Sequence, residues 1–180
     1  MLAIAVAVFA WLAFQSHQEA GLGRTANAAP PPVREIPAER IALLARIEPP
    51  EYSPPSAGSM PVSGEFRAAM ESYGHGDYAR AVSGLRAVTQ KQPQFVEARF
   101  YLAISLLLSN DRSTAIQELQ TVIAAGATPY LEPARFFLAK ALLGDHNISG
   151  ADQQLRTVAQ MHGKLEKQAQ VLHAQIVPRP

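Results

Sequence analysis

The sequence predicts an all-α protein, built as a solenoid of about three helical hairpins and closed by a C-terminal capping helix. Three observations support this fold class. From residue 62 onward an apolar pattern recurs every 34 to 36 residues, a spacing typical of helical repeats. Within each unit the recurring residues stand at i, i+4 and i+7, which is one face of a helix. Between the two apolar runs of each unit lies a short turn with Gly, Asn or Asp.

The recurring residues place the helices of each unit. In the second helix of each unit the recurring positions are Ala81, Leu85 and Val88, then Ala115, Leu119 and Val122, then Ala151, Leu155 and Val158. In the first helix, the run ARFYLA at residues 98–103 returns as ARFFLA at residues 134–139, and Phe66 and Ala69 hold the matching positions of the first unit. We therefore expect a repeat domain over residues 62–176, which ends in a capping helix that starts near Leu165.

Small residues recur where the two helices of a hairpin would approach most closely. They are Ala69, Ala103 and Ala139 in the first helices, and Ala81, Ala115 and Ala151 in the second helices. Together with the turn Gly76-Asp77-Tyr78 and the closing Pro93, this pattern resembles the tetratricopeptide repeat (TPR) family over residues 62–160. The resemblance implies a TPR-like solenoid that binds proteins. The chain departs from the family near the start of the first helix. The family has a bulky aromatic residue there, whereas the three units of this chain have Glu65, Arg99 and Arg135.

Two stretches resemble a narrower group, the membrane-anchored TPR half of bacterial anti-sigma-factor-like zinc-finger proteins. They are LLARIEPPEY at residues 43–52 and PYLEPARFFLAKALL at residues 129–143. The chain has no Cys, so the zinc-finger part of such proteins cannot be assigned to it. The resemblance implies an alternative function, that of a sensor or regulatory extracytoplasmic segment of such a system whose cytoplasmic half is missing.

The N-terminal residues 1–14, MLAIAVAVFAWLAF, carry no charged or polar side chain. As a helix they would reach roughly 21 Å, short of the roughly 30 Å hydrocarbon core of a bilayer. We interpret them as a transmembrane or signal-anchor helix that lacks its beginning, with a cleaved signal peptide and a buried core helix as the alternatives. The sequence thus predicts a single-pass membrane protein whose repeat domain is extracytoplasmic (periplasmic), or else a secreted protein.

A proline-rich linker is expected over residues 15–61, because nine of the fourteen prolines lie between Pro30 and Pro61. Within it, residues 38–47 (AERIALLARI) place Ile41 and Leu44, with Leu43 and Ile47 as further members, on one side of a short amphipathic helix. This helix has two interpretations. It caps the nearest repeat, or it is a built-in ligand that occupies the groove of the repeats.

Composition and motifs argue against catalysis and against nucleic acid as a partner. The formal net charge is +1 and no basic run is present. The histidines lack the spacing of a zinc site, and no phosphate-binding loop, nucleophile elbow or metalloprotease motif occurs. We therefore expect no enzymatic activity, no cofactor, no metal and no small-molecule substrate.

The partner is expected to be a protein or an amphipathic peptide, in addition to the membrane through the N-terminal helix. By the TPR resemblance, the first helices line a concave groove at Phe66, Met70, Tyr73, Phe100, Ile104, Leu107, Phe136, Lys140 and Leu143. These residues are mostly apolar, which favours an apolar peptide over a C-terminal carboxylate. The alternative is that the array or the linker buries them. The sequence thus predicts a membrane-tethered interaction scaffold.

Overall fold

The computed structural model describes residues 36–52 and 63–177 of the 180-residue chain. Within these ranges the chain forms eight helices and no strand, which confirms the all-α prediction. The helices are α2 (Ala38–Ala45), α3 (Gly64–Gly74), α4 (Tyr78–Lys91), α5 (Val96–Leu108), α6 (Arg112–Ala124), α7 (Leu131–Gly144), α8 (Ile148–Gln160) and α9 (Glu166–Ile176).

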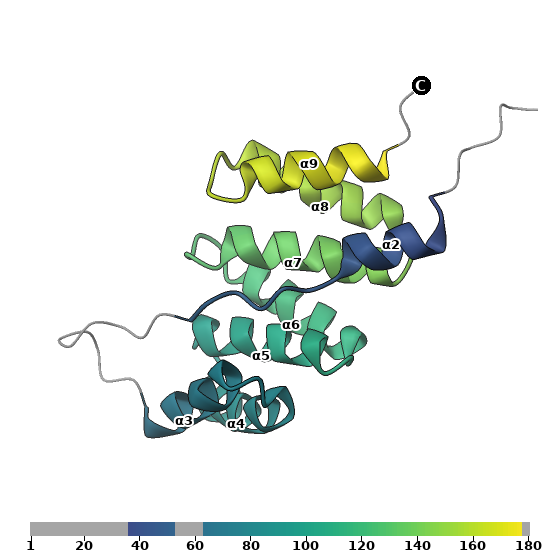
Figure 1. Ribbon diagram of the computed structural model, residues 1–180. Helices are drawn as coiled ribbons and strands as arrows, with labels where there is room; N and C mark the ends of the chain where they lie inside the picture. Colours follow the sequence, from purple (N-terminus) through teal and green to yellow (C-terminus); the bar gives the residue numbers. More distant parts are fainter. Residues whose placement is uncertain (1–35, 53–62, 178–180) are drawn as a thin grey trace, which may run out of the picture. The chain divides into compact units, whose positions relative to one another are not determined.

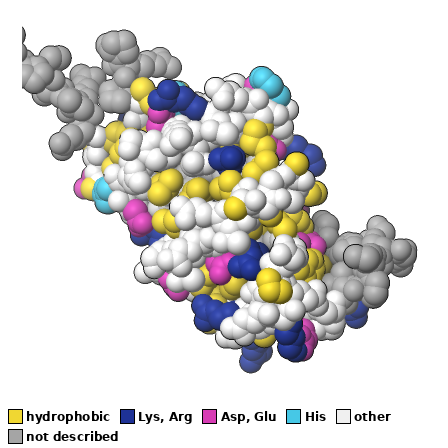
Figure 2. Space-filling view, turned by 180° about the vertical axis from the view of Figure 1, so that it is seen from behind, with side chains coloured by type: hydrophobic (Ala, Val, Ile, Leu, Met, Phe, Trp, Pro, Cys, Tyr) yellow, Lys and Arg dark blue, Asp and Glu magenta, His cyan; other side chains and the backbone are white. Residues whose placement is uncertain are grey.

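The helices from α3 to α8 form three consecutive hairpins, and each hairpin packs against the next. Figure 1 shows the first helices, α3, α5 and α7, in one layer, with the second helices, α4, α6 and α8, behind them. α9 packs against α8 and continues the stack. On the face that carries the second helices, basic, acidic and apolar side chains lie interspersed (Figure 2).

The turns inside the three hairpins share one backbone conformation and one kind of N-cap. The residue before the N-cap has a positive φ: Gly76 at 77°, Asn110 at 65° and His146 at 57°. The N-cap side chain then accepts a hydrogen bond from the backbone N–H three residues on, as Asp77, Asp111 and Asn147 do at 3.1, 3.3 and 2.9 Å. These bonds satisfy amides that would otherwise lack partners at the start of a helix.

The two helices of the first hairpin approach closely because both carry small residues at the crossing point. A Cβ atom built on Gly84 of α4 would lie only 2.8 Å from the Cβ of Ala69 in α3. The six alanines predicted at the close contacts are all buried, with at most 3% of their surface exposed. Any larger side chain there would have to push the helices apart.

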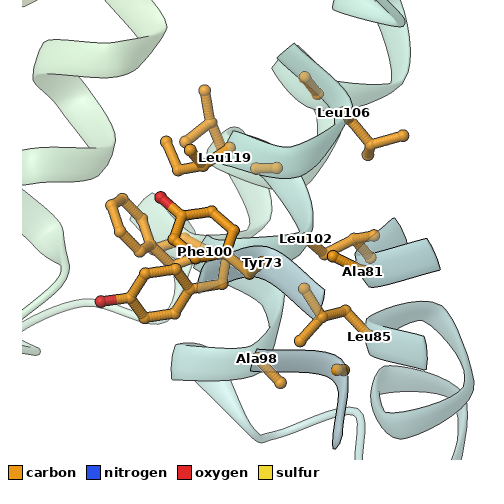
Figure 3. Close-up of a cluster of buried hydrophobic side chains, with 14 of the residues drawn as sticks. Tyr73, Ala81, Leu85, Ala98, Phe100, Leu102, Leu106 and Leu119 are labelled. Atoms are coloured by element: carbon orange, nitrogen blue, oxygen red, sulfur yellow. The ribbon is translucent and has the colours of Figure 1, made fainter. Parts of the chain in front are cut away.

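Buried side chains form two neighbouring clusters. The first is made by the first two hairpins with part of α7, and Figure 3 shows Leu85, Phe100, Leu102 and Leu119 within it. The second joins α7, α8 and α9, and Ile41 of α2 belongs to it. Repeats stabilised in this way depend mainly on contacts with their nearest neighbours.

Polar pairs also join the helices of the second and third hairpins. Arg99 donates to the carboxylate of Glu118 at 2.6 Å, and Arg135 donates to the side-chain oxygen of Gln154 at 2.9 Å. Both pairs have the same spacing of 19 residues. The basic residues that replace the expected aromatic therefore link the first helix of a hairpin to its second helix.

The localisation expected from the sequence needs correction. Among residues 36–52 and 63–177, no helix is long and apolar enough to cross a membrane, which contradicts the prediction of a single-pass membrane protein with a periplasmic repeat domain. The physical reason is length, since the longest helices, α4 and α7, have 14 residues and reach roughly 21 Å of the roughly 30 Å required. The helix predicted at residues 1–14 lies outside the described residues.

Candidate functional site

The nine residues predicted to line a groove lie on α3, α5 and α7, whose shared side is called here the first-helix face. Seven of the nine are buried: Phe66, Met70, Tyr73, Phe100, Ile104, Phe136 and Leu143. Leu107 and Lys140 are half-buried. In this state a partner can reach only a small part of the predicted surface, so the cover over the face has to be identified.

Residues 36–52, called here the covering segment, lie over the first-helix face. α2 packs against α7. The chain then runs past α5, as the dark blue trace in Figure 1 shows. Tyr52 at its end contacts Tyr101 of α5 and Phe66 of α3. The covering segment therefore crosses the repeats in the direction opposite to their order in the sequence.

The helical part of the covering segment packs on the array through Ile41, with Leu44 and Ala45 partly buried beside it. Ile41 is only 6% exposed and belongs to the buried cluster that contains Phe136, Ala139 and Leu143. Leu43, two residues later on α2, is 72% exposed. α2 thus inserts one side chain among residues of the predicted groove and leaves its opposite side accessible.

The non-helical part is held through its backbone. The Tyr73 hydroxyl of α3 donates a hydrogen bond to the carbonyl oxygen of Pro50 at 2.8 Å. The Tyr101 hydroxyl of α5 donates to the carbonyl oxygen of Glu51 at 3.4 Å. Two neighbouring first helices therefore present donors to two consecutive carbonyls of the covering segment.

The Tyr52 ring completes this contact. It stands edge-on to Phe66, with 6.0 Å between the ring centroids, and edge-on to Tyr101, with 5.4 Å between them. The ring centroids of Tyr73 and Tyr101 are 5.2 Å apart, again in an edge arrangement. Such aromatic pairs add about 0.5–1.5 kcal/mol each beyond the area they bury.

The environment keeps the tyrosine hydroxyls neutral. Burial, with a smaller contribution from the negative charge of Glu97, raises the pKa of Tyr101 to about 12. Burial also raises the pKa of Tyr73 well above its ordinary value. A neutral phenol donates a hydrogen bond and a phenolate does not, so both hydroxyls remain donors over the physiological pH range.

Lys140 is the one basic residue among the nine. Burial lowers its pKa, and the nearby negative charge of Glu48 in the covering segment opposes that shift. Its Nζ lies 5.9 Å from the centroid of the Phe136 ring, at the distance of a cation–π contact. Lys140 thus places a positive charge at the edge of an apolar surface, close to a carboxylate of the covering segment.

Two hollows flank α2. One, of about 740 Å³, lies between α2 and the C-terminal end of α5 and includes Leu107 and Arg112 in its lining. The other, of about 390 Å³, lies between α2, α7 and α9 and includes Phe136 and Lys140. Among residues 36–52 and 63–177, no group of three or more His, Asp or Glu side chains is arranged to hold a metal ion.

Sequence reasoning missed two residues of this contact, Tyr101 of the first-helix face and Tyr52 of the covering segment. In the sequence, Tyr101 belongs to a repeated apolar run and Tyr52 to the stretch LLARIEPPEY. The pattern held one signal for Tyr101, because the matching position of the third hairpin is Phe137 and the hydroxyl is therefore an addition to the repeat. No local sequence pattern singles out Tyr52, because its partners Phe66 and Tyr101 lie in the hairpins, distant from it in the sequence.

Comparisons with known proteins agree with this architecture. A sequence profile of the tetratricopeptide repeat family matches residues 72–132. The structure is similar to that of the Yersinia enterocolitica type III secretion chaperone SycD in complex with a peptide of the translocator YopD, with 14% identity, a TM-score of 0.58, and coverage of 62% of this chain and 88% of that one.

It is also similar to a chain of the CopN–Scc3 complex, with 16% identity, a TM-score of 0.53, and coverage of 69% of this chain and 79% of that one. No curated protein sequence matches the chain. These comparisons do not show the likeness to anti-sigma-factor-like proteins, which stays an expectation. The part of the chain that the structure describes contains a tetratricopeptide repeat match and has a TPR-like fold similar to that of these two structures.

Proposed function

We propose that this protein is a protein-binding scaffold without catalytic chemistry, and that the first-helix face is its binding surface. The observation that carries the proposal is the covering segment itself. The face already accommodates a peptide-like stretch of this chain through an apolar anchor, two hydrogen bonds to the backbone and aromatic edges. These are the contacts with which repeat and groove proteins bind peptides.

The proposed contact residues are the nine of the sequence prediction, extended by Tyr101. Leu107 and Lys140 are half-buried and accessible now. Tyr73 and Phe136 lie where the covering segment contributes part of the cover, whereas Phe100 is buried by neighbours within the array. The similar SycD structure contains a bound peptide, and the other similar chain is part of the CopN–Scc3 complex. By analogy of fold, the partner of this chain is a protein segment with an apolar face.

In vivo photo-crosslinking tests the proposal. A photoreactive residue at Leu107 lies on the first-helix face, beside the larger hollow. A photoreactive residue at Gln120, exposed on α6, is the matched control on the second helices. We expect discrete protein adducts from position 107 and only background from position 120. Equal adduct patterns at the two positions, or none at position 107, would contradict the first-helix face as the binding surface.

A further inference from the structure

The array of hairpins has a core of its own without the covering segment. All the fully buried members of the first cluster come from α3 to α7, and Ile47 and Tyr52 only pack against it as partly buried residues. In the second cluster, Ile41 is the only buried residue supplied by the covering segment. The covering segment is thus an addition to a continuous stack, to which it is joined through residues 53–62.

Its non-helical end has the chemistry of a proline-rich ligand. Pro49 and Pro50 have no backbone N–H, so this stretch accepts hydrogen bonds through its carbonyls but donates few. The first-helix face offers the complement, the hydroxyls of Tyr73 and Tyr101, together with aromatic ring surfaces. Aromatic-lined surfaces recognise proline-rich segments by this match, because such segments lose little entropy on binding.

The helical end has the chemistry of an amphipathic ligand, with Ile41 buried, Leu44 partly buried beside it and Leu43 exposed. Between the two ends stands Glu48, whose negative charge acts on Lys140 of α7. The four features follow one another in the order apolar helix, carboxylate, proline pair and aromatic ring. The apolar helix packs against α7, whereas the carbonyls of Pro50 and Glu51 and the ring of Tyr52 contact α3 and α5.

We propose that the covering segment is a ligand in cis, which occupies the binding surface until a partner segment displaces it. The inference rests on the proposed function and gives the partner its chemistry. That partner carries a short amphipathic helix with a buried apolar anchor, then prolines followed by an aromatic residue. Binding of the partner is weakened by the fraction of time that the face is occupied in cis.

Cleavage of the intact protein tests the cis ligand. A protease recognition sequence is placed within residues 53–62 of the full chain, and after cleavage the retention of residues 1–52 on the array is measured by dilution and gel filtration. We expect the fragment to remain bound, and Ile41→Asp and Tyr52→Ala each to weaken its retention roughly tenfold or more, as loss of a buried anchor does. Leu43→Asp, on the exposed side of the same helix, should change retention less than about threefold, as is usual for contacts outside a hot spot.

Competition in trans tests the displacement. A fluorescent peptide of residues 36–52 (IPAERIALLARIEPPEY) is titrated into the uncleaved wild-type chain and into the uncleaved Ile41→Asp chain. The peptide should bind the variant roughly tenfold more tightly, because the variant leaves the face open. Equal affinity for the two chains would overturn the cis ligand.

Three other outcomes would also overturn it. The fragment leaves the wild-type array at once at micromolar concentration, the array unfolds when the fragment leaves, or light scattering shows a dimer in which each covering segment sits on the other copy. Failure of the proposed function is distinguishable from these. In that case the fragment stays bound as expected, and position 107 forms no adduct with another protein.

Discussion

The array of hairpins and the covering segment are held in place by different kinds of contact. In the array, residues close in sequence are brought together at every level, from the N-caps of the turns to the close approach of Ala69 and Gly84. The covering segment is held by a few distant contacts, and its Tyr52 meets Tyr101 of the second hairpin. Local contacts repeated three times give a cooperative stack, whereas a few distant anchors give an element that can detach alone.

This difference divides the first-helix face, which we propose as the binding surface, into a part buried by the array and a part covered by the covering segment. Phe100 is buried by neighbours within the array, among them Tyr130 and Phe137. Tyr73 and Phe136 instead lie where the covering segment contributes part of the cover. The three phenylalanines of the predicted groove therefore divide between the two clusters, with Phe66 and Phe100 in the first cluster and Phe136 in the second.

The largest effect is expected in the array. Phe100→Ala removes a ring that is 2% exposed, so it should lower the free energy of unfolding by about 3–5 kcal/mol through the cavity it leaves. Chemical denaturation followed by circular dichroism measures this. A loss below about 1 kcal/mol would show that the ring is not part of the array's core, because removing a core phenylalanine destabilises a protein by more than that.

A smaller effect is expected in the covering segment. Ile41→Asp should release α2. It should lower the free energy that holds the covering segment on the array by about 1.5–3 kcal/mol, the value of burying one aliphatic side chain. Hydrogen exchange should then show fast exchange in α2 and unchanged protection in α5. Leu43→Asp is the control, because Leu43 is 72% exposed. Loss of protection throughout the array would show that the two regions form one cooperative unit.

The third effect in order of size is expected at alkaline pH, which should weaken the contacts between the covering segment and the array. The pKa of Tyr101 is raised to about 12 from an ordinary value of 10.0, so the folded protein favours the neutral phenol. That contribution to stability is complete below pH 10 and is lost as the pH rises from 10 toward 12. Tyrosinate absorbance and exchange in residues 36–52 measure the change. Tyr101→Phe should reduce the pH dependence, and an unchanged dependence would mean that Tyr101 does not cause it.

The smallest expected effect is a gain in the stability of the array. His146 has a φ of 57°, a conformation that glycine adopts without steric cost and that Gly76 adopts in the first hairpin. His146→Gly should therefore raise the free energy of unfolding by about 0.5–1 kcal/mol, net of the greater entropy of glycine in the unfolded chain. Thermal denaturation measures it, and the retention of the covering segment should not change. A destabilised variant would show that the His146 side chain contributes contacts that outweigh its backbone strain.

The sequence by itself determined the hairpins. Their helices, turns and close contacts depend on residues a few positions apart, and a threefold repeat shows which of these residues matter, as the alanines at the helix crossings do. The membrane localisation drawn from composition was wrong, because the helices of the described residues are too short and too polar to cross a bilayer.

Only the tertiary structure decided what covers the first-helix face. The sequence placed Ile41 on one side of a short helix and left open whether that helix caps a repeat or occupies the groove. The hydrogen bonds from Tyr73 and Tyr101 to backbone carbonyls have no sequence signature, because any residue supplies a carbonyl. The path of the covering segment, from α7 back to α3, depends on contacts across up to 50 residues, which no local period records.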